Sequence, residues 1–121
     1  NTLKELVKDI DILSLSLPLI ESTEGIIDLD ILSNASNKLV IVNTSRALIV
    51  NQNSLIQALK LNKIKAYLTD VLEEEPMIEN HPLLQFDNVL ITPHIGSRTY
   101  ESVQRQGMMA VDNLFHALKI K

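Results

Sequence analysis

The 121-residue sequence contains no cysteine, which excludes disulfide bonds and thiolate metal sites. No apolar run approaches the roughly 20 residues that a membrane-spanning helix needs, and no signal peptide is visible. The 11 basic side chains are scattered and outnumbered by 15 acidic ones, which gives a net charge of −4. Nucleic acid is therefore not an expected partner, because phosphate binding needs a clustered basic surface.

Aromatic residues are scarce as well. They make up 3% of the sequence, whereas hydrophobic residues make up 45%. The core must therefore be built from Ile, Leu and Val, which is typical of sheets that are covered by helices on both faces. The chain begins with Asn1 rather than Met and enters a helical pattern at once, so we expect it to be part of a longer polypeptide.

Hydrophobic periodicity predicts helices that alternate with strands. Thr2 and Glu5 form a capping-box pattern, and Asn51 or Asn53 is expected to cap the third helix. The predicted helices cover residues 3–8, 28–36, 54–62 and 99–118, and the predicted strands cover 11–19, 38–45, 64–71 and 88–92, with an acidic loop over 72–88. The last helix carries one stripe, formed by Val103, Gly107, Val111, Leu114 and Leu118. The alternation predicts one α/β domain with a partial, doubly wound parallel sheet of about four strands.

In such sheets, ligands bind beyond the carboxyl ends of the strands. Arginine binds a carboxylate in a two-pronged fork, and histidine can accept or donate a proton near neutral pH. A carboxylate beside the histidine would hold its tautomer and stabilise its charged form. The residues at or just beyond the ends of the four predicted strands are Leu17, Pro18 and Thr23, then Thr44, Ser45 and Arg46, then Asp70 and Glu73–Glu75, then His94, Gly96 and Ser97. Together they predict acid–base chemistry on a small anionic substrate.

Each of these residues also has an ordinary structural interpretation. Arg46 alone could be a surface salt-bridge partner, and residues 73–75 could be a solvated loop. His94 could follow Pro93 simply because a proline closes the strand. His81 and His116 are interpreted as structural or surface residues, and no zinc site is expected because no two histidines have ligand spacing. The joint placement at strand ends favours the functional interpretation.

Four segments resemble the D-isomer-specific 2-hydroxyacid dehydrogenases, a family that includes phosphoglycerate, glycerate and glyoxylate enzymes. They are DILSLSLPLIESTEGII, LVIVNTSRALIV, AYLTDVLEEEP and HPLLQFDNVLITPHIGS, and they occur in the family's order. The resemblance implies that residues 1–121 are the C-terminal half of a Rossmann-type NAD(P)-binding domain. It implies hydride transfer between a nicotinamide and a small D-2-hydroxy acid or 2-oxo acid, with NAD favoured over NADP. It also implies a cytoplasmic homodimer.

The resemblance assigns three catalytic roles. Arg46 would bind the substrate carboxylate, His94 would be the acid/base on the substrate oxygen, and Glu75 would hydrogen-bond His94 and hold it in place. Asp70 would contact the nicotinamide amide. The cofactor-binding residues that the resemblance implies are Leu17, Pro18, Thr23, Thr44, Ser45, Asp70, His94, Gly96 and Ser97.

The sequence departs from the family's pattern in several places. Ala47 stands where the family usually has Gly, Asn51 where it has Asp, and Ser16 where it has His. If the backbone at Ala47 has a positive φ, the alanine would cost about 1 kcal/mol or somewhat more. No G-x-G-x-x-G motif occurs, so the phosphate-binding turn and the residue that selects NAD or NADP should lie upstream of Asn1. The substrate domain is absent too, and the isolated segment is expected to be inactive.

Two other functions stay open at this point. The same family includes transcriptional corepressors that keep the fold and the dinucleotide site, so the chain could belong to a dinucleotide-sensing binding module. It could also be an inactive remnant whose sheet exposes an edge and favours oligomers. Turnover of a simple 2-oxo acid would favour the enzyme, whereas peptide binding without turnover would favour the binding module.

Overall fold

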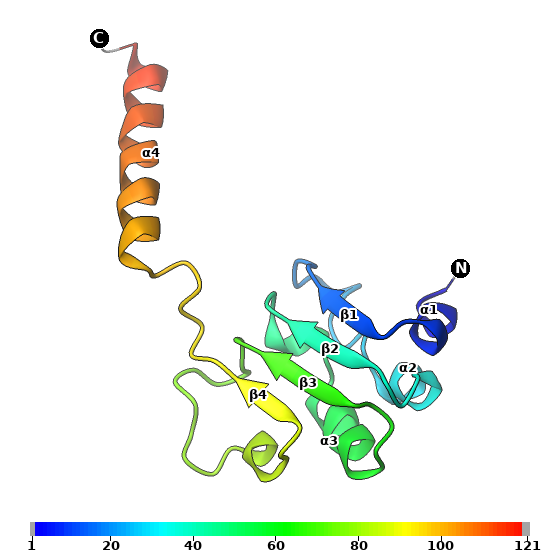
Figure 1. The fold of residues 1–121 in the computed structure, drawn as a ribbon. Coiled ribbons are helices and arrows are strands. Elements are labelled where there is room, and N and C mark those ends of the chain that lie inside the picture. Colours follow the sequence, from blue (N-terminus) through cyan, green and yellow to red (C-terminus); the bar gives the residue numbers. More distant parts are fainter. Residues whose placement is uncertain (1, 120–121) are drawn as a thin grey trace.

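The computed structural model describes residues 2–119 and contains a four-stranded parallel sheet with flanking helices (Figure 1). The predicted helices and strands are confirmed in type and order, but the strands are shorter than predicted. The elements are α1 (Leu3–Asp9), β1 (Ile12–Leu15), α2 (Leu29–Asn34), β2 (Val40–Asn43), η1 (Ala47–Ile49), α3 (Gln52–Lys60), β3 (Ala66–Thr69), η2 (Pro82–Gln85), β4 (Val89–Ile91) and α4 (Tyr100–Leu118). The predicted 72–88 loop thus contains a 3₁₀ turn, η2.

Local hydrogen bonds explain where the helices begin. The Thr2 side chain accepts a bond from the Glu5 amide while the Glu5 carboxylate accepts one from the Thr2 amide, so the predicted capping box is present. Asn51, rather than Asn53, caps α3 by accepting a bond from the Ser54 amide at 2.9 Å. Asp28 caps α2 in the same way.

The four strands end level with one another. Their order is β1-β2-β3-β4 and every neighbouring pair is parallel. One row of register partners runs across the last positions of the strands: Leu15, Asn43, Thr69 and Ile91. The residues that follow these four positions therefore share one rim of the sheet, as the sequence predicts.

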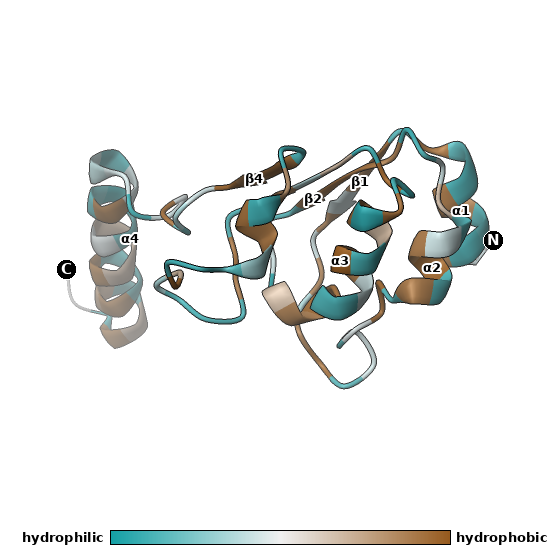
Figure 2. Cartoon of the chain, turned by 90° about the horizontal axis from the view of Figure 1, so that it is seen from below, coloured by the Kyte–Doolittle hydropathy of each residue, from teal (hydrophilic) through white to brown (hydrophobic). Residues whose placement is uncertain are grey.

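The core lies on one face of this sheet. In Figure 2, α2 and α3 cover the same face, and α1 packs beside α2. The side chains of Ile41 on β2 and Tyr67 on β3 point to this face and are buried against these helices. On the opposite face, Ile12 is 65% and Leu90 57% exposed. The described residues thus form a one-sided half of the expected doubly wound arrangement.

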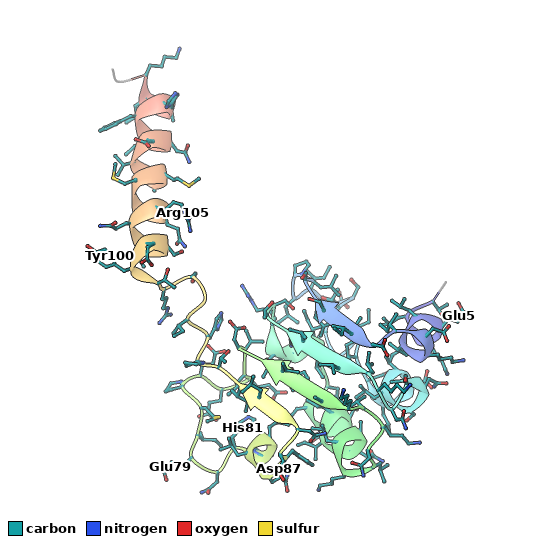
Figure 3. All side chains as sticks on the ribbon, viewed as in Figure 1. Glu5, Glu79, His81, Asp87, Tyr100 and Arg105 are labelled. Atoms are coloured by element: carbon teal, nitrogen blue, oxygen red, sulfur yellow. The ribbon has the colours of Figure 1, made fainter. Side chains whose placement is uncertain are left out.

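Helix α4 extends away from the sheet (Figure 1). The predicted helix is confirmed and capped by Thr99, but none of its residues is buried. Its predicted stripe is exposed, and Tyr100 and Arg105 project from its first turns well away from the sheet (Figure 3). No helix within residues 2–119 is both long and apolar enough to span a bilayer. The parallel sheet with its crossover helices is a Rossmann-type α/β fold.

Candidate active site

The loop after β1 is organised by one threonine. The Thr23 hydroxyl donates to the Pro18 carbonyl at 2.7 Å and accepts from the Ile20 amide at 2.9 Å. The Gly25 amide, at a residue with φ of 62°, donates to the Leu48 carbonyl and ties this loop to η1. Leu17 and Pro18 are exposed at the rim, so this loop can present both to a ligand while Thr23 holds its shape.

The turn after β2 presents Arg46. Its side chain is exposed, and its guanidinium donates to the Ser45 carbonyl at 2.6 Å. Thr44 is also exposed, and Ser45 is half-buried. Ala47 opens η1 and is not among the residues with positive φ. The condition under which an alanine would cost energy there, a positive φ, is therefore not met.

The ends of β3 and β4 meet around Asp70. One of its carboxylate oxygens, Oδ1, is buried without a hydrogen-bond partner among the described residues. A Cβ placed on Gly96 would lie 3.7 Å from the other oxygen, Oδ2, so the backbone at Gly96 passes beside this carboxylate. An orphaned acceptor at the rim fits a ligand that brings an N–H donor, because unpaired buried acceptors are costly.

His94 and Glu75 form a direct pair. The Nδ1 atom of His94 lies 2.8 Å and 3.1 Å from the two carboxylate oxygens of Glu75. Glu75 also accepts a bond from the Leu72 amide at 2.9 Å. The Leu72 amide first, and His94 second, lower the pKa of Glu75 below its ordinary value. Glu75 is therefore a carboxylate that accepts a hydrogen bond from the protonated Nδ1 of His94, while Nε2 of His94 has no hydrogen-bond partner within residues 2–119.

The backbone around His94 is unusual. The His94 amide donates to the Thr92 carbonyl at 3.0 Å, which closes a tight turn around Pro93. His94 itself has φ of 31°, in the left-handed region that residues other than glycine seldom adopt. Such outliers cluster at functional sites, where the surrounding structure holds them.

A cavity of about 580 Å³ opens beside this pair. Polar groups of Asp70, Glu75, His94 and Arg98 line it, together with apolar side chains such as Met77. Arg46 is not in its lining, and within residues 2–119 no hydrogen bond or ion pair joins Arg46 to His94 or Glu75. The structure thus brings Glu75, His94 and Asp70 together, and leaves Arg46 at the end of the neighbouring strand.

The other histidines lie elsewhere. His81 is only 5% exposed and its Nδ1 accepts from the Leu83 amide at the start of η2, below β4 in Figure 3. The structural interpretation of His81 is therefore confirmed. His116 lies on the exposed surface of α4. Among the residues that the structure describes, no three His, Asp or Glu side chains are grouped so that they could hold a metal ion.

Sequence reasoning missed two residues. Arg98 lines the cavity, and Asn43 is fully buried at the end of β2. Arg98 lies on the loop between β4 and α4, where nothing in the local pattern marks it. Asn43 could have been found, because it is a polar residue that ends an otherwise apolar buried strand, and such residues need hydrogen-bond partners.

A cavity at the carboxyl edge of a parallel α/β sheet is the usual ligand site of this class of fold. The chain belongs to the family described as D-isomer specific 2-hydroxyacid dehydrogenase, NAD binding domain, whose sequence model matches residues 1–96. The sequence resemblance to this family is thereby confirmed. NAD or NADP is accordingly the cofactor type of this domain family.

Similar proteins carry related names. A glyoxylate reductase of Aeropyrum pernix is 42% identical over 113 residues, which is 93% of this chain and 34% of that protein. The human glyoxylate reductase/hydroxypyruvate reductase is 37% identical over 95% of this chain and 35% of its own length. The chain therefore spans about a third of the length of these relatives.

Solved structures agree with this grouping. A glyoxylate reductase of Paecilomyes thermophila matches with a TM-score of 0.86 and 33% identity, over 99% of this chain and 36% of that one. An NADPH-dependent glyoxylate/hydroxypyruvate reductase of Sinorhizobium meliloti, in complex with NADP and malonate, matches with a TM-score of 0.83 and 32% identity, over 93% and 35%.

Proposed function

We propose that this chain is the C-terminal half of the NAD(P)-binding domain of an enzyme that interconverts a small D-2-hydroxy acid and its 2-oxo acid. The Gly-rich half of that domain and the substrate domain would lie outside these 121 residues. The observation that carries the proposal is the 2.8 Å pair of His94 and Glu75 beside a cavity at the carboxyl edge of the sheet.

His94 is proposed as the acid/base. Because Glu75 is a carboxylate, it can only accept, so the proton of a neutral His94 resides on Nδ1 and Nε2 is an acceptor. In oxidation, Nε2 takes the proton of the substrate hydroxyl. In reduction, the doubly protonated ring returns that proton to the oxygen of the 2-oxo acid. Glu75 holds the ring in the tautomer that both directions need.

Arg46 is proposed to bind the substrate carboxylate. Its exposed guanidinium has donors left for a two-pronged bond beyond the one to the Ser45 carbonyl. The pair of His94 and Glu75 carries little net charge when His94 is protonated, so a bound anion needs a further cation, which Arg98 of the cavity lining or Arg46 can supply. Arg46 lies on the same rim as this pair, one strand beyond Asp70.

The dinucleotide is proposed to lie along the same rim. When bound, it supplies the group that accepts or donates the hydride at C2 of the substrate. The Oδ1 of Asp70, which has no hydrogen-bond partner in the described part of the chain, fits an amide donor of the nicotinamide. The remaining proposed cofactor contacts come from Leu17, Pro18, Thr23, Thr44, Ser45, His94, Gly96 and Ser97.

The test uses the complete reading frame that includes this chain. NADH and NADPH oxidation are followed with glyoxylate, hydroxypyruvate, phosphohydroxypyruvate and pyruvate, beside a His94→Ala variant. Turnover that falls about 10²–10⁴-fold in the variant, with a much smaller change in dinucleotide affinity, supports the proposal. Unchanged turnover in the variant refutes the role of His94. Tight dinucleotide binding without turnover of any substrate would instead support a dinucleotide-sensing binding module.

The 121 residues alone are expected to show no turnover. The reason is that the Gly-rich turn which binds the dinucleotide phosphates is not in this sequence. A measurable rate from the isolated chain, lost in His94→Ala, would contradict this expectation.

A further inference from the structure

A buried amide lies directly beneath the turn that carries Arg46. Asn43 is the last residue of β2 and has no exposed surface. Its neighbours on β3, Tyr67 and Thr69, are also buried. These three side chains are the polar part of an otherwise apolar sheet face. A polar side chain in such a place needs every hydrogen-bonding group to be satisfied.

All four hydrogen-bonding positions of the Asn43 amide are filled. Its Nδ2 donates to the Arg46 carbonyl at 3.0 Å and to the Tyr67 hydroxyl at 3.2 Å. Its Oδ1 accepts from the amide and from the hydroxyl of Ser45, both at 3.1 Å. A flipped amide would place donor against donor at Ser45 and acceptor against acceptor at Arg46. The turn therefore fixes the orientation of the Asn43 side-chain amide, and the amide in turn stabilises the conformation of the turn.

Hydrogen bonds to its carbonyl fix the backbone position of Arg46. The Arg46 carbonyl accepts from Asn43 and, at 3.3 Å, from the Ile49 amide, and Arg46 has an extended backbone with φ of −144° and ψ of 138°. Its own side chain is exposed, and its guanidinium donates to the neighbouring Ser45 carbonyl at 2.6 Å. The position from which the Arg46 side chain extends is therefore set by its backbone, and the Asn43 side chain holds that backbone through its hydrogen bond to the Arg46 carbonyl.

We propose that Asn43 is a positioning residue that places Arg46 for the substrate carboxylate. This inference rests on the proposed function, in which Arg46 binds that carboxylate. The Asn43 backbone extends the connection to the next strand, because its carbonyl accepts from the Thr69 hydroxyl at 3.0 Å and from the Asp70 amide at 3.3 Å. Asn43 thus joins the two turns that present Arg46 and Asp70.

The test is a double-mutant cycle in the complete reading frame, made with Asn43→Ala and Arg46→Ala. Two quantities are measured: kcat/KM for glyoxylate, and the affinity of the dinucleotide-bound protein for oxalate, a diacid of the same length that is not turned over. With Arg46 present, Asn43→Ala should lower both by about 10- to 100-fold, since small displacements of a substrate-binding group cost this much. With Arg46→Ala, the further loss should nearly vanish.

Two more variants keep the test decisive. Asn43→Asp retains the shape and the acceptor but loses both Nδ2 donors, so it should reproduce the loss even if Asn43→Ala fails to fold. Tyr67→Phe removes the other partner of Nδ2 without touching the Arg46 turn, and should leave both quantities unchanged. The proposal would be overturned if Asn43→Ala lowered kcat/KM and oxalate affinity equally with Arg46 and with Arg46→Ala. It would also be overturned if Asn43→Asp left the oxalate affinity unchanged. Because oxalate affinity needs no turnover, the cycle decides the role of Asn43 separately from the proposed reaction.

Discussion

Replacing Glu75 by glutamine tests whether the carboxylate orients His94. The carboxylate now accepts from the Leu72 amide and from Nδ1 of His94. A glutamine keeps one acceptor oxygen but replaces the other by an amino group, which is itself a donor. If its oxygen faces Leu72, its amino group faces Nδ1 and favours the tautomer with the proton on Nε2. If the glutamine side-chain amide is rotated by 180°, its amino group faces the Leu72 N–H, so that two donors oppose each other.

The size of the effect follows from the exposure of the pair. The side chains of His94 and Glu75 are 47% and 39% exposed, so their attraction is screened and contributes little to stability. The effect on turnover is larger, since a ring with its proton on Nε2 cannot accept the substrate proton. We expect kcat to fall by about 10²–10⁴-fold, the usual value of acid–base catalysis, with dinucleotide affinity retained.

The assay is steady-state turnover in the complete reading frame, with Glu74→Gln as the matched control. Glu74 is adjacent and exposed, and it makes no hydrogen bond in the described part of the chain. Its replacement removes the same charge without disturbing His94. A Glu75→Gln protein with wild-type kcat, or an equal loss in Glu74→Gln, would refute the reasoning.

Arg46→Lys should raise KM for the 2-oxo acid and also lower kcat, because the point charge of a lysine cannot replace the two-pronged bond of a guanidinium to a carboxylate. Arg105→Lys on α4 is the control. Equal kinetics in the two variants would refute the role of Arg46. The pKa of Glu75 is lowered in the folded state, so its contribution to stability is present above the unfolded pKa and lost as the pH falls through the folded pKa. The difference in unfolding free energy between wild type and Glu75→Gln, which is small because the pair is exposed, should therefore disappear in acid, which denaturant titrations can check. Asn51→Ala should cost about 1 kcal/mol of unfolding free energy and Asn53→Ala clearly less, since only Asn51 caps α3.

Much of the fold could be predicted because its signals are local. Capping of α1 and α3 joins residues three positions apart, so Thr2 and Glu5 can be recognised without a structure and the α3 cap can be narrowed to Asn51 or Asn53. The strands were predicted too long because apolar runs continue past the sheet. Leu17 belongs to the apolar run of the first strand, yet β1 ends at Leu15 and Leu17 lies exposed in the following turn.

The candidate site depends on contacts that local patterns do not contain. Glu75 and His94 are 19 positions apart, and Asn43 and Tyr67 are 24 apart. The sequence alone determined the order of helices and strands, the capping box of α1, and which residue types follow each strand. Only the tertiary structure decided that the strands end level, that His94 contacts Glu75 while Arg46 lies apart, and that Asn43 is buried beneath Arg46. The physical reason is that caps and periodicity act over a single turn, whereas parallel register and burial arise only when distant segments pack together.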